Sequence, residues 1–341
     1  MIFTGKGRAR FLDAVTGFET AVRQGDGERS QQAMQDIQRH FEHAGDADLA
    51  QVGPRLAALL PAVPPGPRAL VAVLVGACVE RGADPRTCAP QIFQGLVEAL
   101  GVAQEFCERW AATGGGDFPD PDPAALTEAA LERVGQDAAV GWITLQQWEM
   151  ASNALLNHRA VRTTLPPEVR LRLLRALHEI REASGHDFKC LRYALLVLDD
   201  EPLLALHRPT GTGFLLRMTG MGDNFQLHTL LADVLIGGGH VPGQAPAAQE
   251  AAVCRDAPGQ VPTTGAFNLV TPSGEWVWNE GTPTDIPVVD GVRVLVLDPA
   301  PYERGWPAGR FFPGMTGDLV LERVLGADET GEWLGRCTPP K

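Results

Sequence analysis

The chain has 341 residues, of which 44% are hydrophobic and 21% charged, which is typical of a folded globular protein and long enough for two domains. Its formal net charge of −13 argues against general binding to nucleic acid or to an anionic membrane, because both require a basic surface. Lysine is rare while arginine, alanine, glycine and proline are abundant, which indicates the codon usage of a GC-rich bacterium.

The N-terminal sequence and the cysteines bear on the cellular location. The first residues, "MIFTGKGRARFLDAV", become charged before an apolar stretch develops, so we expect no secretion signal. The most apolar windows are shorter than the roughly 20 residues that a membrane-spanning helix needs. Six cysteines are scattered without a CxxC motif. We therefore expect reduced thiols and a cytoplasmic protein.

The first half of the chain has helical periodicity. Phe11, Val15 and Phe18 recur at helical spacing, and Ser30 is a candidate N-cap of the next helix. The stretch "TGGGDFPDPDP" interrupts the pattern, since proline lacks a backbone donor and glycine is costly in a helix. We predict helical regions over 1–112 and 124–187, joined by a linker or long loop over 113–123.

After residue 187 the pattern changes to short apolar runs separated by turn residues. The segment "LRYALLVLDDEPLLALHRPTGTGFLLRMTG" contains three such runs, which is typical of an antiparallel meander. A second hairpin is expected in "AFNLVTPSGEWVWNE", and "VRVLVLD" and "DLVLERVL" are further strand candidates. The predicted architecture is α+β, with a helical N-terminal half followed by an α+β region with antiparallel hairpins over 188–341.

The stretch "MTGMGDNFQLHTLLADVLIGGGH" resembles the strand, glycine turn and helix of a phosphate-binding site. Gly220 and Gly222 fit a dinucleotide fingerprint, but Phe225 occupies the position of the third glycine, and the chain has no GK[ST] sequence. We predict a packed helix over about 224–236, capped by Asp223 or Asn224. The alternative is that its N-terminus binds a carboxylate or phosphate.

Most familiar catalytic motifs are missing. None of the four serines lies in GxSxG, and Lys189 is the one lysine away from the termini, which argues against a nucleophile elbow and against a Schiff base. The histidines do not have the spacing of a zinc site. We therefore predict no metal and no cofactor. The acid–base candidates that remain are two histidines and two carboxylates in the α+β region: His207, His228, Asp223 and Asp298.

Aromatic and arginine residues are the strongest binding signal. Trp276 and Trp278 are two residues apart and point to the same face of an extended strand. The segment "PYERGWPAGRFFPGM" has too many glycines and prolines for a regular strand, and we predict a loop. The ligand-binding candidates from both segments are Trp276, Trp278, Tyr302, Arg304, Trp306 and Arg310. Packing of these rings in the core is the alternative.

Two classes of function follow from the sequence. The first is a non-catalytic binding or accessory protein that recognises a peptide, a protein or a small acidic ligand through an aromatic and arginine groove. The second is an enzyme of unfamiliar type that uses histidine and carboxylate acid–base chemistry. We expect neither nucleic acid nor membrane as a partner, and self-association stays open.

Overall fold

The computed structural model describes residues 2–341, with side chains described from residue 6, and the chain divides into two compact units, Met1–Arg192 and Tyr193–Lys341. Helices fill the first unit and a mixed sheet with helices forms the second, so the predicted α+β class is confirmed. None of the described helices is both long and apolar enough to cross a membrane.

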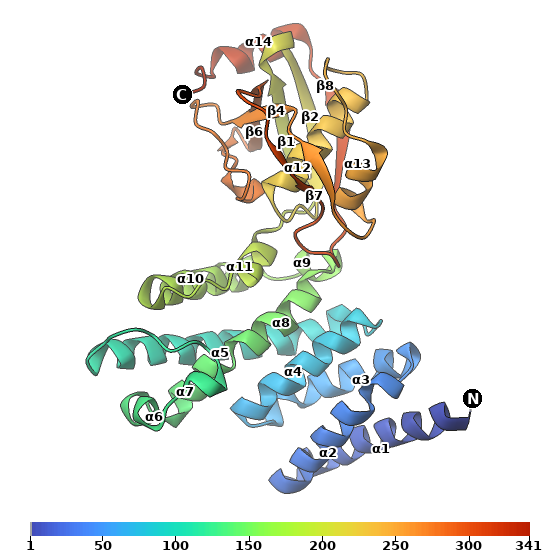
Figure 1. The fold of residues 1–341 in the computed structure, drawn as a ribbon, viewed down its shortest axis with the longest axis vertical. Helices are drawn as coiled ribbons and strands as arrows, with labels where there is room; N and C mark the ends of the chain where they lie inside the picture. Colours follow the sequence, from blue (N-terminus) through green and yellow to red (C-terminus); the bar gives the residue numbers. More distant parts are fainter. Residues whose placement is uncertain (1) are drawn as a thin grey trace. The chain divides into compact units, whose positions relative to one another are not determined.

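The first unit consists of helices joined by short turns and by one longer loop between residues 112 and 128 (Figure 1). The α-helices are α1 (Ile2–Gln24), α2 (Gly27–His40), α3 (Asp46–Leu59), α4 (Pro65–Glu80), α5 (Pro85–Ala112), α6 (Glu128–Val134), α7 (Gln136–Ile143), α8 (Leu145–Leu156), α9 (Arg159–Arg162) and α10 (Pro167–Ser184). Three 3₁₀ turns accompany them: η1 (Phe41–His43), η2 (Leu60–Ala62) and η3 (Pro123–Ala125).

Helix α1 carries the apolar stripe that its periodicity predicts. Phe11 and Val15 are fully buried and Phe18 is 2% exposed. The predicted cap of the next helix is wrong, because Asp26, and not Ser30, caps α2 by accepting a hydrogen bond from the Arg29 amide. Ser30 lies inside the helix and donates to the Asp26 carbonyl. Asp and Ser are equally good caps, so composition alone did not place the first turn.

The stretch 113–123 lies inside the first unit, whereas the unit boundary falls after Arg192. Side chains hold this loop in place: the Trp110 indole donates to the Gly116 carbonyl and the Trp142 indole to the Pro119 carbonyl. The Phe118 ring lies 5.9 Å from that of Trp110 and 6.0 Å from that of Trp142. Aromatic packing therefore fixes a segment that its glycines and prolines exclude from helix.

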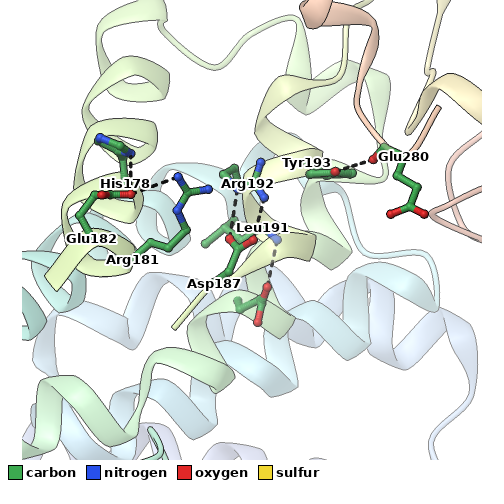
Figure 2. Close-up of polar contacts among 9 residues, drawn as sticks. His178, Arg181, Glu182, Asp187, Leu191, Arg192, Tyr193 and Glu280 are labelled. Carbon is green, nitrogen blue, oxygen red and sulfur yellow. Dashed lines mark hydrogen bonds and ion pairs between the residues drawn. The ribbon is translucent and has the colours of Figure 1, made fainter. Parts of the chain in front are cut away.

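Helix α10 buries Leu173, Leu177 and Ile180, which recur at helical spacing and share one face of the helix. After it, Asp187 forms an ion pair with Arg192 at 2.7 Å, and Figure 2 shows this contact. The next helix, α11 (Lys189–Leu196), contains the unit boundary. It corrects the expected meander, because the first apolar run after residue 187 is helical and only the next two runs are strands. Short apolar runs of this kind do not distinguish helix from strand by periodicity.

The second unit is built on a six-stranded mixed sheet with the order β4-β6-β1-β2-β8, and β5 pairs with β6. Strands β1 and β6 are parallel, and the other neighbours are antiparallel. The strands are β1 (Glu201–His207), β2 (Thr212–Thr219), β4 (Phe267–Val270), β5 (Val288–Val289), β6 (Val292–Pro299) and β8 (Asp318–Val324). The parallel pair is important for the site, because the carboxyl ends of β1 and β6 meet at one edge.

Helices cover both faces of this sheet (Figure 1). On one face, Leu203 and Leu295 pack with α12 (Asn224–Ala232) and α13 (Ala248–Arg255). On the other, Leu204 and Val294 pack with α14 (Ala327–Gly335). Helix α12 is the packed helix of the glycine stretch, capped by the Asp223 carboxylate, and it continues as the π-helical turn η5 (Asp233–Gly237). Two 3₁₀ turns complete the unit: η4 (Arg208–Thr210) and η6 (Pro283–Asp285).

The segment "PYERGWPAGRFFPGM" was predicted to be a loop, and this is wrong for four of its residues, whereas the rest is irregular. It contains β7 (Gly305–Ala308), which pairs with β3 (Val261–Thr264) in a separate two-stranded sheet. The register places Pro262 opposite Pro307. Alternate pairs of an antiparallel ladder exchange no hydrogen bonds, so two prolines fit at such a pair without loss.

Candidate functional site

A cleft of about 980 Å³ lies in the second unit, at the carboxyl ends of β1 and β6. One wall is formed by the end of α12 and the turn η5, and others by the loop 242–247, by β3 and by the segment after β6. The polar residues that line it come from several of these elements and from β1, β6 and α13: His207, Thr229, Gln244, Glu250, Thr263, Thr264, Asp298, Tyr302 and Glu303. This volume lies at the upper end of the range of small-ligand pockets.

His207 is the last residue of β1 and is 5% exposed. Its Nδ1 lies 2.7 Å from the Thr210 hydroxyl, which in turn donates to Thr212. The Thr210 oxygen therefore accepts from Nδ1–H, and Nε2 carries the lone pair. Nε2 has no hydrogen-bond partner among the described residues, and the side chain lines the cleft. Burial lowers the pKa of His207 although Asp298 opposes the shift, which favours the neutral ring.

Asp298 lies beside His207 at the end of β6. It follows Leu297, the register partner of His207, so strand alternation turns its side chain towards the opposite face of the sheet. Oδ1 accepts from Arg208 at 2.8 Å, and Arg208 also donates to the Thr338 carbonyl. Oδ2 is buried without a hydrogen-bond partner. Asp298 therefore forms an ion pair at the border of the cleft.

The other two acid–base candidates lie elsewhere. His228 is 1% exposed in α12, and its Nε2 donates to the Phe267 carbonyl at 2.8 Å. Burial lowers the pKa of His228 to about 4, so this ring is neutral inside the core. Asp223 caps α12. Of the four candidates, the structure brings His207 and Asp298 to the cleft and leaves His228 and Asp223 in structural positions.

Three of the aromatic and arginine candidates form a surface group that we call the rim cluster: Trp276, Tyr302 and Arg304. The Arg304 guanidinium lies 5.7 Å from the Trp276 ring and 5.2 Å from the Tyr302 ring. Trp276 is 46% and Tyr302 56% exposed, and Tyr302 also lines the cleft. The rim cluster therefore offers exposed rings beside the opening.

The other three candidates are not part of this cluster. Trp306 is 8% exposed and packs between Phe225 and His228. Arg310 donates to the carbonyls of Ala257 and Met315. Trp278 is 69% exposed, and the buried Val277 lies between it and Trp276. The strand expected here is wrong, because only an isolated bridge joins Trp276 to Val270, while β4 pairs with β6. The six candidates therefore have three kinds of environment: Trp306 lies in the core, Arg310 holds backbone carbonyls, and the others lie at the surface.

Several cleft residues escaped the sequence analysis. Glu250, Glu303, Thr263 and Thr264 belong to no motif, and they meet only because β3 and the first turn of α13 fold beside the ends of β1 and β6. A usable signal was the pair of apolar runs "PLLALH" and "VRVLVLD", which both end in an ionisable residue. The described residues contain no group of three or more His, Cys, Asp or Glu side chains arranged for a metal ion.

Comparison with known proteins does not assign this chain to a class: no family model matches it, and no curated protein or solved structure is significantly similar. Any functional conclusion must therefore come from the site itself.

Proposed function

We propose that this chain is a small-ligand binding protein whose second unit receives its ligand in the cleft at the ends of β1 and β6. The observation that carries the proposal is His207, a buried imidazole whose Nδ1 is fixed by Thr210 and whose Nε2 has no protein partner where it meets the cleft. Nε2 is open to the cleft rather than sealed inside the protein, so a bound molecule can replace water as its hydrogen-bond donor.

The rim cluster supplies the second support. Exposed tryptophan, tyrosine and arginine side chains are the residues most enriched at binding sites, and Tyr302 joins the cluster to the cleft. Of the ligand classes expected from the sequence, a small molecule fits the cleft volume better than a protein surface does. A bacterial, cytoplasmic accessory role is part of the proposal. The six free thiols agree with a reducing compartment, and the arginine-, alanine- and glycine-rich composition agrees with a GC-rich bacterium.

An acid–base enzyme is a second candidate, and the same imidazole favours it. A neutral histidine with a bare Nε2 that lines a cleft has the geometry of a general base. Asp298 lies close enough to influence the His207 pKa, but its nearest charged partner is Arg208. A binding protein needs only the hydrogen-bond acceptor at His207 Nε2, whereas an enzyme also needs further reacting groups. We therefore favour the binding protein over the enzyme.

A pair of neighbouring alanines allows a sharp test. Ala247 and Ala248 are both exposed, but Ala247 lines the cleft and Ala248 does not. We expect Ala247→Trp to fill the cleft and abolish binding, whereas Ala248→Trp adds the same bulk outside it. A fragment collection screened by ligand-observed NMR should give hits that bind the wild type and Ala248→Trp, but not Ala247→Trp. If every hit binds both variants equally, the cleft is not the binding site.

Mass spectrometry of the hits distinguishes the two candidates. Compounds recovered unchanged after incubation support a binding protein. Compounds converted by the wild type but not by His207→Gln support the enzyme, because glutamine keeps a hydrogen-bond acceptor but cannot take up a proton near neutral pH.

A further inference from the structure

The side chains that line the cleft have a strong charge bias. The acidic residues on its walls are Glu250, Asp298 and Glu303, of which Asp298 turns its carboxylate to the opposite face of the sheet, and no lysine or arginine of the described chain lines the cleft. Glu303 is exposed, and Glu250 is partly exposed in the first turn of α13, where the helix dipole favours negative charge. The cleft therefore has a negative potential.

The arginines nearest to this site are held by other groups. Arg208 is paired with Asp298 at 2.8 Å, which compensates the charge of that carboxylate. Arg304 donates to Asn268 at 3.2 Å and lies over the rings of the rim cluster. The Glu250 carboxylate accepts a hydrogen bond from the neutral Thr263 hydroxyl at 2.8 Å. The carboxylates of Glu250 and Glu303 are thus the charges that an incoming ligand meets.

Hydrogen bonding points in the same direction as charge. His207 presents Nε2 as an acceptor, because its single ring proton lies on Nδ1 towards Thr210. Carboxylates are acceptors only. A ligand that donates hydrogen bonds and carries positive charge satisfies all of these groups, whereas an anion is repelled by the two carboxylates and finds no cationic side chain on the walls.

We infer that the ligand of this cleft is a small organic cation with a primary amine or guanidinium group, held by the Glu250 and Glu303 carboxylates and by His207 Nε2. The inference rests on the proposed function and narrows it. It also reverses the small acidic ligand expected from the arginines of the sequence, since those arginines lie outside the cleft.

Three probes of equal carbon length test the sign of the ligand charge: 1,4-diaminobutane, 1,4-butanediol and succinate. Isothermal titration calorimetry at low salt should show that the diamine binds at least about tenfold more tightly than the other two compounds. Glu303→Gln should weaken diamine binding by roughly threefold to tenfold, because it removes one carboxylate from the wall. Ala247→Trp should abolish it.

The matched control is Glu332→Gln. Glu332 is exposed on α14, lies outside the cleft and undergoes the same change in net charge. Its effect on the diamine should stay below about twofold, since distant exposed charges are screened by salt. Equal weakening by both variants would show attraction to the whole acidic surface and would overturn the inference.

Two further outcomes also overturn it: equal or tighter binding of succinate or butanediol, and absence of diamine binding. Neither outcome contradicts the proposed function. That proposal fails only if no fragment loses its binding when Ala247 is replaced by tryptophan. The charge of the ligand and the existence of the site are therefore tested separately.

Discussion

Trp306 is the residue for which the sequence left the sharpest choice, between a ligand contact and a core side chain. In the structure its ring lies 4.8 Å from that of His228 and 5.2 Å from that of Phe225, and 8% of the residue is exposed. Its Nε1 is buried without an acceptor. We therefore expect Trp306→Ala to act on stability rather than to remove a ligand contact.

The magnitude follows from these contacts. A buried tryptophan removes roughly 200 Å² of apolar surface from water. At 25 cal/mol per Å², losing this burial lowers the free energy of unfolding by about 5 kcal/mol. The unpartnered Nε1 costs the wild type about 1–3 kcal/mol, which offsets part of the loss. The expected decrease in the free energy of unfolding is therefore about 3 kcal/mol. For a unit of this size, it corresponds to a decrease in Tm of roughly 6–12 °C.

Urea unfolding followed by circular dichroism measures the change, and Trp306→Phe is the matched control. Phenylalanine keeps most of the ring packing and removes the orphaned N–H, so its loss should be about 1 kcal/mol or less. A loss within about 0.5 kcal/mol for Trp306→Ala would refute the reasoning, because only a surface residue tolerates such a truncation.

Two other predictions test the core near the site. The pKa of His228, lowered by burial from 6.5 to about 4, means that below pH 6.5 the unfolded chain binds a proton that the folded chain does not. The free energy of unfolding should therefore decrease between pH 6.5 and 4 by roughly 1 kcal/mol per pH unit, and urea titrations near pH 7 and pH 5 measure this slope. Gly220 and Gly211 have nearly the same positive φ, 66° and 64°, but a Cβ would overlap the Thr316 carbonyl only at Gly220. In thermal unfolding, Gly211→Ala should cost about 1–2 kcal/mol and Gly220→Ala at least about 1 kcal/mol more; equal losses would contradict the predicted overlap.

Local patterns predicted a large part of the fold. The stripe of Phe11, Val15 and Phe18 and the cap at Asp223 are set by residues close in sequence, so a single window contains the information. The apolar runs of β1 and β6 were also recognised, but their parallel pairing was not. Pairing depends on contacts between residues about 90 positions apart, as for His207 and Leu297, and no local pattern encodes these contacts.

The site was less predictable than the fold for the same reason. His207, Asp298 and Tyr302 stood out by residue type, and the cleft does contain them. Glu250 and Glu303 resemble any of the other acids of this chain until α13 and the end of β6 bring them to one cleft. Residue type therefore identified His207, Asp298 and Tyr302. The negative charge of the cleft depends on glutamates that only the folded topology distinguishes from the other acids of the chain.

Trp306 links the core to the cleft without lining it. Gly265 lines the cleft, and a Cβ at this glycine would lie 2.7 Å from the Trp306 ring, so the backbone of the wall rests on the indole. The Gly265 amide also donates to the Arg304 carbonyl at 2.8 Å, which ties the same wall to the rim cluster. Truncation of Trp306 should thus loosen the wall and weaken binding only together with stability. Ala247→Trp, by contrast, should abolish binding in a protein that unfolds like the wild type, because Ala247 is exposed and the substitution leaves unchanged the backbone carbonyl with which it caps α13. The two variants are therefore distinguished by stability. Trp306→Ala, which removes support from the wall, should lose binding and stability together, whereas Ala247→Trp, which fills the cleft, should lose binding alone.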